Sequence, residues 1–502
     1  MSRIQYIILS DIHLGGYNSL LTFIQETPRN PNGTRYNVDA QKTSPVLRDL
    51  AECIKEIVNS INKGGKPQII LLGDVMELAL GGLNDASMTF ERFLECMYSR
   101  KNAPFSNQIL YLPGNHDHHL WETAREKQYA NYISKLKPKE HISAPWHTTK
   151  MVHPDLIESD LLTDLFRRNH KSKQGKVMIA YPNYEIRGKS GRSIFLTHGN
   201  FLENIYSLMS SIQRILLPEL SGSDGLKSKK KSGLLSRIAK MLPLQAVPEP
   251  NRPDSIYELE HENFAWIDFF WSTLGRSGKV GKGVGLIYDM LQDEKAVGKL
   301  SDNISGYLLR KLKILPFFKT IVQYALSFFL KKAILNVGQS ERGMSDSVLS
   351  QEVIENLNFY LETILPNQWK EETRREYPIN YSFIFGHTHK PFETLSEDLG
   401  LETRSVPVFN TGGWVVDTIQ KMKTHGGAVL LVDEDANVVS FHAYTEGDIR
   451  PSFHVPKGYQ NPLYADLLAK VNLEGRSFKK LSQSIASEIE LRRKVLRARV
   501  VE

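Results

Sequence analysis

The sequence predicts an α/β protein whose mixed β-sheet core is interrupted by a large, mainly helical insertion. Short apolar runs alternate with segments of helical periodicity over the first 200 residues, a pattern typical of α/β domains. Several of these runs end directly in polar residues, and open α/β sheets place their ligand sites at such strand ends. About 190 residues of different character, rich in lysine and in apolar residues at helical spacing, separate His198 from His387.

The first predicted elements are three short strands and one helix. We predict strands at residues 4–9, 69–72 and 109–112, because each is a short apolar run. We predict a helix at residues 46–61, because its apolar residues recur at helical spacing.

The later elements complete the core on both sides of the insertion. Further strands are predicted at residues 177–181, 193–197, 381–385 and 406–409. Residues 428–432 and 438–443 predict a closing hairpin, which indicates a mixed rather than a purely parallel sheet. We therefore divide the chain into the first part of the core (1–200), a helical insertion or cap (201–379), the second part of the core (380–450) and a helical, basic C-terminal tail (451–502).

Composition limits the class of protein. The chain has 502 residues, 41% of them hydrophobic and 24% charged, which excludes a wholly disordered or collagen-like chain. Two cysteines, Cys53 and Cys96, are too few for a disulfide framework and suit a reducing compartment. The first ten residues lead into a strand pattern without the apolar segment of a signal peptide, so we expect a cytoplasmic location.

The charge balance bears on the partners. A net charge of +7 favours anionic partners such as phosphate esters, nucleic acid or an acidic lipid surface. The most apolar stretch of the insertion, residues 314–335, has an uncharged centre that is shorter than the roughly 20 residues needed to cross a bilayer. Such a segment can pack inside the insertion, form a homo-oligomer contact or make a peripheral membrane contact with its lysines near the headgroups. The sequence leaves these alternatives open.

Five short motifs contain the candidate metal-binding and catalytic residues, and each motif follows an apolar run. In chain order they are Asp11-Ile-His13, Gly73-Asp74, Gly114-Asn115-His116-Asp117, His198-Gly199 and Gly386-His387-Thr388-His389. Strands lying side by side gather these carboxylates and imidazoles at one edge of the sheet. Crowded carboxylates repel one another, whereas divalent cations convert the repulsion into binding energy. The motifs therefore predict a metal site.

The order of these five motifs resembles that of the calcineurin-like metallophosphoesterases. The similarity covers about residues 1–200 and 380–445 and leaves the insertion and the tail outside. It implies a four-layer α-β-β-α sandwich of two mixed sheets. Residues 73–77 and the position of the insertion are similar to the branch that includes the UDP-diacylglucosamine hydrolases. The chain departs from that branch in its much longer insertion and at His116, where those enzymes carry Arg.

The resemblance implies two divalent cations, with manganese preferred and iron or zinc as alternatives. It assigns their ligands position by position: Asp11, His13 and His389 for one cation, Asn115, His198 and His387 for the other, and Asp74 as a bridge. Carboxylate, imidazole and amide groups suit these metals. Such a pair implies hydrolysis of a phosphoester or pyrophosphate by in-line attack of a hydroxide that bridges the cations.

The resemblance also implies catalytic roles for His116 and Asp117. His116 matches the family histidine that stabilises the transition state or protonates the leaving oxygen, and Asp117 is expected to orient its ring. His118 and His119 extend the motif and are candidate substrate-binding residues, with a solvent-facing loop as the alternative. We interpret Glu77 as a surface or helix-start carboxylate, with a place behind the metal ligands as the alternative.

The predicted function is a dinuclear metal-dependent phosphoesterase or pyrophosphatase. The sequence leaves its substrate open, and the aromatic and apolar insertion is compatible with a lipid-linked ester. A nuclease or nucleotide phosphodiesterase is the alternative enzyme, because repair nucleases of the same superfamily share Asn115-His116-Asp117 and the basic charge favours a polyanion. The sequence contains no recognisable nucleic-acid-binding module. A non-catalytic scaffold is a third hypothesis, against which the complete ligand set argues.

Overall fold

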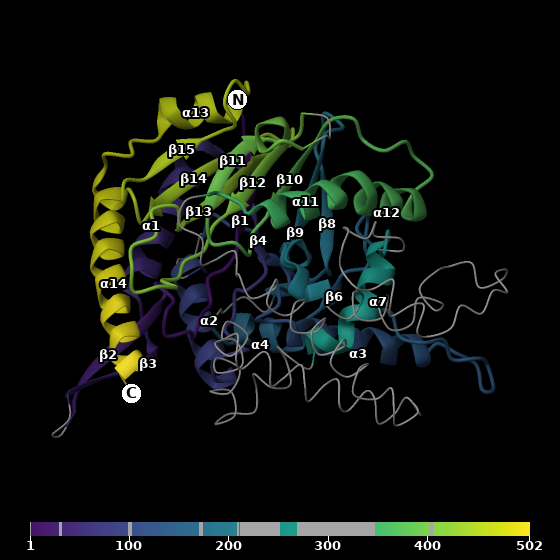
Figure 1. Ribbon diagram of the computed structural model, residues 1–502, viewed down its shortest axis with the longest axis horizontal. Coiled ribbons are helices and arrows are strands. Elements are labelled where there is room, and N and C mark those ends of the chain that lie inside the picture. The colour runs from purple at the N-terminus through teal and green to yellow at the C-terminus, as the bar shows by residue number, and fades with distance from the viewer. Residues whose placement is uncertain are drawn as a thin grey trace, which may run out of the picture.

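Two mixed β-sheets lie face to face and helices cover the outer face of each, as Figure 1 shows for the computed structural model. The structure describes residues 2–29, 33–98, 103–169, 174–207, 210, 252–268, 347–401 and 405–501. The four-layer α-β-β-α arrangement expected from the sequence is confirmed, because separate apolar clusters fill the space between the sheets and the space under each helical layer.

The larger sheet has eight strands in the order β15-β14-β13-β1-β4-β5-β7-β6. Its parallel centre consists of β1 (Ile4–Leu9), β4 (Gln68–Leu72), β5 (Gln108–Leu112) and β7 (Lys176–Ile179). Antiparallel strands extend it on both sides, namely β13 (Gly426–Asp433), β14 (Val438–Thr445), β15 (Ser452–His454) and β6 (Ile157–Glu158). The predicted closing hairpin is confirmed as β13 and β14.

The smaller sheet has five strands in the order β11-β12-β10-β9-β8. Its parallel strands are β9 (Ser193–Thr197), β10 (Tyr381–Phe385) and β12 (Pro407–Thr411), flanked by the antiparallel strands β8 (Asn183–Arg187) and β11 (Pro391–Leu395). Strands β9 and β10 pair in parallel although the whole insertion lies between them in the sequence. The insertion therefore leaves the core at the carboxyl end of β9 and rejoins it at the amino end of the neighbouring strand β10.

Side chains alternate between the layers, as the period of two in a strand requires. In β1, Ile7 packs under the outer helices and Ile8 faces the other sheet. In β10, Ile384 lies between the sheets and Phe383 packs against helices of the insertion. Because both faces of these strands are buried, each strand is a continuous apolar run in the sequence, which is why the runs could be recognised.

Helices α1 (Pro45–Ile61), α2 (Leu83–Tyr98) and α4 (Asp160–Asn169) pack on the outer face of the larger sheet. Helix α1 begins where the Ser44 hydroxyl accepts the Val46 N–H at 3.2 Å, with Pro45 in its first turn. The helix at 46–61 is thus confirmed. Helix α3 (His119–Ile133) starts directly after the Asn115-His116-Asp117 motif.

Two helices after residue 451, α13 (Pro462–Lys470) and α14 (Arg476–Val501), belong to the same apolar layer. Helix α14 packs along α1, as Figure 1 shows in yellow and purple. Its Arg492 is fully buried and donates from Nε to the Ser19 carbonyl oxygen at 2.8 Å. A second bond runs from Arg492 Nη2 to the Thr22 carbonyl oxygen. This arginine fixes the loop that follows His13.

Within residues 201–379, all the regular elements of the described residues are helices or helical turns. They form η1 (Asn200–Leu202), η2 (Asn204–Ser207), α7 (Ile256–Ile267), α11 (Gln351–Phe359), the π-helical turn η6 (Tyr360–Ile364) and α12 (Leu365–Glu372). Helices α7, α11 and α12 contribute to the apolar cluster over the smaller sheet. The apolar stretch 314–335, through which membrane contact is expected, lies outside the described residues. Of the helices described, none combines the length and the apolar character that a bilayer-spanning segment requires.

A two-stranded ribbon was not predicted from the sequence. Strands β2 (Thr22–Arg29) and β3 (Gly33–Thr43) pair antiparallel outside the two main sheets. Most of their described side chains are exposed or half-buried, so neither strand carries the continuous apolar run that identified the core strands. A short 3₁₀ turn, η7 (Ser396–Leu399), follows β11.

Candidate metal centre

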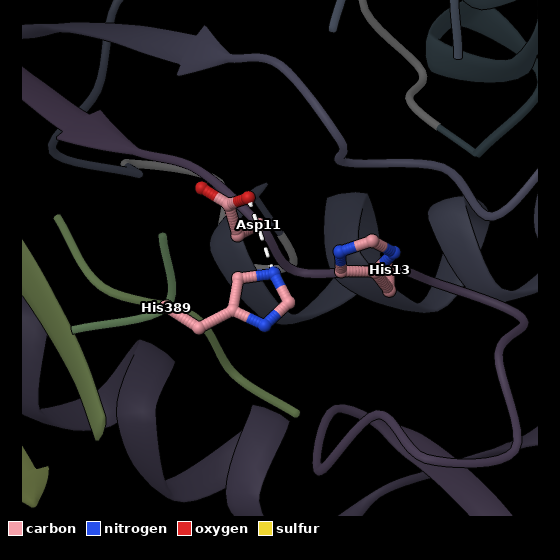
Figure 2. A group of neighbouring side chains, drawn as sticks. All are labelled: Asp11, His13 and His389. Carbon is pink, nitrogen blue, oxygen red and sulfur yellow. Dashed lines mark ion pairs between the residues drawn. The ribbon is translucent and has the colours of Figure 1, made fainter. Parts of the chain in front are cut away.

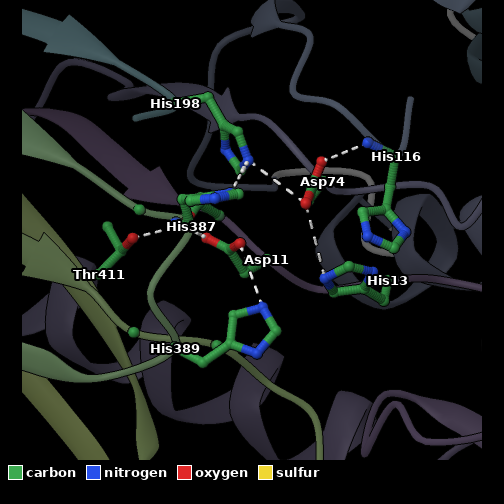
Figure 3. Close-up of polar contacts among 12 residues, drawn as sticks. Asp11, His13, Asp74, His116, His198, His387, His389 and Thr411 are labelled. Carbon is green, nitrogen blue, oxygen red and sulfur yellow. Dashed lines mark hydrogen bonds and ion pairs between the residues drawn. The ribbon is translucent and has the colours of Figure 1, made fainter. Parts of the chain in front are cut away.

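The five motifs converge where parallel strands of both sheets end. Asp11, Asp74 and Asn115 follow β1, β4 and β5 of the larger sheet, and His198 and His387 follow β9 and β10 of the smaller sheet. Figure 3 shows the side chains of the two aspartates and the two histidines pointing toward one another across the seam between the sheets. Each is at most 1% exposed. Residues that are far apart in the sequence thus form one buried polar cluster.

Backbone strain is concentrated in this cluster. Five of its residues adopt left-handed backbone conformations, which residues other than glycine rarely take. Their φ values are 51° at Asp11, 49° at His13, 50° at Asp74, 70° at His387 and 60° at His389. Such a conformation costs of order 1–3 kcal/mol for each residue and persists where the surroundings impose it, most often at functional sites.

Two glycines permit the close packing of the strand ends. A Cβ atom at Gly73, where φ is 81°, would lie 2.3 Å from Nδ1 of His198. A Cβ atom at Gly386 would lie 2.4 Å from Oδ2 of Asp11. Larger residues at these two positions would separate strand ends that the cluster requires to be in contact.

One group of candidate ligands consists of Asp11, His13 and His389, which Figure 2 shows around a common point. Their ligand atoms lie within 4.8 Å of one another. Nε2 of His389 is 3.4 Å from Oδ1 of Asp11, and the rings of His13 and His389 have centroids 5.4 Å apart. The loop after β1 of the larger sheet therefore supplies two of these residues, and the loop after β10 of the smaller sheet supplies the third.

A second group consists of Asp74, His198 and His387. Nε2 of His198 lies 3.3 Å from Oδ2 of Asp74, 3.3 Å from Nδ1 of His387 and 3.2 Å from Oδ1 of Asn115. The same Asp74 oxygen is 3.9 Å from Nε2 of His13. Asp74 therefore lies between the two groups, in the position of a shared ligand.

His116 forms a third group with His13 and Asp74. Its backbone N–H donates to Oδ1 of Asp74 at 2.8 Å, and its ring meets that of His13 edge-on with centroids 4.6 Å apart. The histidine assigned a catalytic role by resemblance therefore lies beside the two ligand groups and is also within reach of a metal ion.

Glu77 is buried behind the cluster, 3% exposed, and is not the surface carboxylate that the sequence suggested. Its Oε2 lies 2.8 Å from Nδ1 of His13, and its Oε1 lies 2.9 Å from Nδ1 of His116. One carboxylate thus orients a candidate metal ligand and the candidate catalytic histidine together. It also accepts the Leu80 N–H at 2.8 Å, which closes the turn after β4.

Other carboxylates contact the outer nitrogens of the ligand histidines. Oδ2 of Asp417 lies 2.6 Å from Nδ1 of His389, and Oε1 of Glu203 lies 3.2 Å from Nε2 of His387. Partners of this kind fix the ring orientation and raise the basicity of a ligating histidine. Sequence reasoning missed both, because each is a single acidic residue in a loop with no motif around it.

Asp117 faces the backbone of the neighbouring strand ends rather than the ring of His116. Its carboxylate accepts the N–H groups of Gly114 at 2.6 Å and Val75 at 2.8 Å, and its Oδ2 also accepts the hydroxyl of Tyr111. The expected contact with Nδ1 of His116 is made by Glu77 instead. The carboxylate of Asp117 therefore holds the two ligand loops in register.

His118 and His119 lie apart from the three ligand groups. The His118 ring is 1% exposed, and its neighbours include Tyr181 and Phe264, with centroids 5.5 and 5.4 Å away. Burial lowers the pKa of His118 to about 3, so this ring is neutral at pH 7. His119 is partly exposed, with its Nδ1 3.2 Å from Glu122. Their substrate-binding role stays a prediction.

The charges of the cluster shift the pKa values of its members. Burial raises the pKa of Asp11, but His198 and His389 outweigh it and lower that pKa to about 2. Burial lowers the pKa of His198, but Asp74 and Asp11 outweigh it and raise that pKa to about 9. The metal-free cluster therefore keeps a proton on His198 at neutral pH.

The residues present fit a pair of divalent cations. Oδ1 of Asp11 and Nε2 of His13 are buried and have no hydrogen-bond partner among the described residues. Such atoms are costly to bury unless a ligand satisfies them. Carboxylate, imidazole and amide donors without a thiolate suit manganese, iron or zinc. Neither cysteine belongs to the ligand groups found in the described part of the chain.

Comparison with protein families matches residues 4–229 to a family described as calcineurin-like phosphoesterase. The matched segment contains Asp11, Asp74, Asn115 and His198, whereas His387 lies beyond it. No match to the chain is found among curated proteins or among solved structures.

Proposed function

We propose that the chain belongs to the calcineurin-like phosphoesterase family, which its residues 4–229 match, and that it is a metal-dependent hydrolase of a phosphoester or pyrophosphate bond. The observation that carries this proposal is the convergence of Asp11, Asp74, His198 and His387 from two sheets on one buried point. A fold alone does not specify an activity, but a complete set of buried ligands argues for chemistry at that point.

The proposed ligand assignment follows the two groups in the structure. Asp74 would be the ligand shared by two cations. The other ligands would be Asp11, His13 and His389 for one cation, and Asn115, His198 and His387 for the other. Manganese is the proposed metal. A pair of divalent cations supplies activation of water for in-line attack on phosphorus and neutralisation of charge on the phosphoryl oxygens.

The proposed role of His116 is to move a proton. Its Nδ1 contacts Glu77, and the other ring nitrogen, Nε2, is the one proposed to deliver a proton to the departing oxygen. Burial raises the pKa of Glu77, but His116 and His13 outweigh it and lower that pKa, so the carboxylate is ionised at neutral pH. A charged partner of this kind stabilises the protonated ring of His116.

The proposed substrate class is a lipid-linked phosphoester, and the proposed location is cytoplasmic. The support for the substrate class is the aromatic and apolar composition of the insertion, which connects the strand that ends before His198 to the strand that ends before His387. An apolar cap beside the centre would favour an ester with an apolar portion. Both cysteines are unpaired, as a reducing compartment would keep them.

The test is metal reconstitution of the chelated, full-length chain. Manganese, iron and zinc would be added separately, and turnover measured on p-nitrophenyl phosphate, its bis-ester, single-stranded DNA and a lipid pyrophosphate. We expect metal-dependent hydrolysis of at least one ester, with the preferred substrate separating a lipid-ester hydrolase from a nuclease. Failure with every metal and every ester would instead favour a non-catalytic scaffold.

Asp74→Asn is the decisive variant for the ligand assignment. We expect turnover at background and loss of at least one bound metal per chain, measured by elemental analysis, because Asp74 lies between the two groups. Asp49→Asn is the matched control, since Asp49 is also a buried aspartate but pairs with Arg48 on α1, away from the cluster. Full turnover and full metal content in Asp74→Asn would refute the assignment.

A further inference from the structure

A protruding segment follows α3, and we call residues 133–150 the α3 arm. Nearly all of its residues up to Trp146 are exposed, in contrast to the buried start of the same helix. Figure 1 shows this blue segment extending away from the sheets beyond the end of α3. The arm therefore presents its side chains outward and contributes little to the apolar core.

Large apolar side chains are exposed together on the α3 arm. Ile133 is 39% exposed, Ile142 is 50% exposed and Trp146 is 44% exposed. They account for three of the nine large apolar residues that are exposed in the described part of the chain. Single exposed apolar residues are ordinary, but several on one protruding segment indicate a contact surface.

The charge of the arm is strongly positive. It contains Lys135, Lys137, Lys139 and Lys150 against the single acidic residue Glu140. None of the four lysines forms an ion pair with another described residue. The carboxylate of Glu140 accepts the backbone N–H of Lys137 at 2.9 Å and so is engaged within the arm. The lysines are therefore available to an anionic partner.

Aromatic residues fix the arm against α3. The ring of Trp146 meets that of Tyr132 edge-on at 5.1 Å, and Tyr132 stacks on Tyr129 at 6.0 Å. The Tyr129 hydroxyl donates to the Ser143 carbonyl oxygen at 2.8 Å, and Arg125 donates to the Trp146 carbonyl oxygen. The loop that carries the exposed apolar and basic side chains is thus held against α3 by these ring contacts and hydrogen bonds.

We propose that the α3 arm docks on a membrane surface that contains anionic lipid. Tryptophan and tyrosine prefer the level of the headgroups, apolar side chains enter the acyl boundary, and lysines contact acidic headgroups. The arm combines these three features, and no described helix spans a bilayer, so the contact is peripheral. This site differs from the apolar stretch 314–335 and does not depend on the proposed hydrolysis.

Docking through the arm would also orient the metal centre. Helix α3 has 15 residues and starts immediately after the His116 loop, so its length of about 22 Å separates that loop from the docked end. The helix would hold the His116 loop at a fixed height above the membrane surface.

The test is sedimentation of the full chain with vesicles of phosphatidylcholine alone or mixed with phosphatidylserine. We expect binding only to the mixed vesicles, weakening with salt. The variant Lys135→Gln/Lys137→Gln/Lys139→Gln should lower partitioning on the order of 100-fold, because each lysine near an anionic surface contributes about 1 kcal/mol. Ile142→Ser/Trp146→Ser should reduce binding to the mixed vesicles at both low and high salt.

The matched control is Lys63→Gln/Lys66→Gln/Lys457→Gln, which removes the same charge from exposed lysines outside the arm. Equal loss of binding in this control would show a general charge effect and overturn the proposal, as would unchanged binding of both arm variants or no binding of the wild-type chain. Turnover of a water-soluble ester is expected to be unchanged in the arm variants. This separates a failure of docking from a failure of the proposed hydrolysis.

Discussion

The carboxylate of Glu77 is the most informative single group to change, because it holds two histidines with different proposed roles. In Glu77→Gln, the side chain keeps its shape but loses its charge and can accept a hydrogen bond with only one oxygen. The bonds at stake are 2.8 Å to His13 and 2.9 Å to His116. A hydrogen bond to a charged group contributes about 1.5–3 kcal/mol, so weakening both is worth about 3 kcal/mol, or roughly a 100-fold effect in total.

The effect should divide between catalysis and metal binding. Turnover at saturating metal is expected to fall about tenfold, because the protonated His116 loses its charged partner, whose bond carries about half of that energy. Metal affinity should also fall about tenfold, at the lower end of the usual effect of removing a group behind a ligating histidine. Turnover and calorimetric metal titration measure the two separately.

The control for this variant is Glu91→Gln. Glu91 of α2 is equally buried but pairs with Arg168 of α4 and belongs to none of the ligand groups, so its replacement should leave both turnover and metal affinity near wild-type values. Wild-type turnover and metal affinity in Glu77→Gln would refute the reasoning, since the two short contacts would then have no energetic consequence.

Three further predictions follow from named contacts. His116→Ala should keep both metals while turnover falls roughly 100-fold; elemental analysis checks this, and loss of a metal would assign His116 to the ligands. In the metal-free chain the pKa of His198 is raised, so the contribution of the protonated His198 to stability is present below about pH 6.5 and is lost as the pH rises through about 9. The melting temperature of the metal-free chain should fall over that range. The affinity for manganese should rise over the same range, because the metal displaces this proton. Burial raises the pKa of Glu260, and the hydroxyl of Tyr181 offsets this only in part. Glu260→Gln should therefore raise the free energy of unfolding by about 1–2 kcal/mol at pH 8 and little at pH 4, which urea unfolding at both pH values measures.

The core strands could be predicted because their burial is recorded directly in the sequence. Strand β4 is apolar on both faces and ends in Gly73-Asp74, so its type, its end and its polar residue all lie within a few consecutive positions. The same holds for β10 and His387. The ribbon of β2 and β3 has no such pattern, because its faces are largely exposed.

The contacts behind the cluster could not be predicted, because they depend on which loops meet in three dimensions. Asp417 reaches His389 across 28 positions, and Glu203 reaches His387 across the whole insertion. Glu77 was visible in the sequence, but its spacing from Asp74 suits a surface turn as well as a buried one. Asp117 shows the reverse case, since its motif was recognised while its backbone contacts were not.

The position of the cluster at the seam between the sheets has a consequence for assembly of the molecule. The larger sheet contributes Asp11 and Asp74, and the smaller sheet contributes His198 and His387, so neither sheet alone offers a complete ligand set. An ion bound there stabilises only the state in which the two sheets are packed together, by an amount that grows with the free concentration of the ion. Chelation should therefore lower the stability of the whole two-sheet fold. Added metal would favour chains in which the two sheets have packed together correctly.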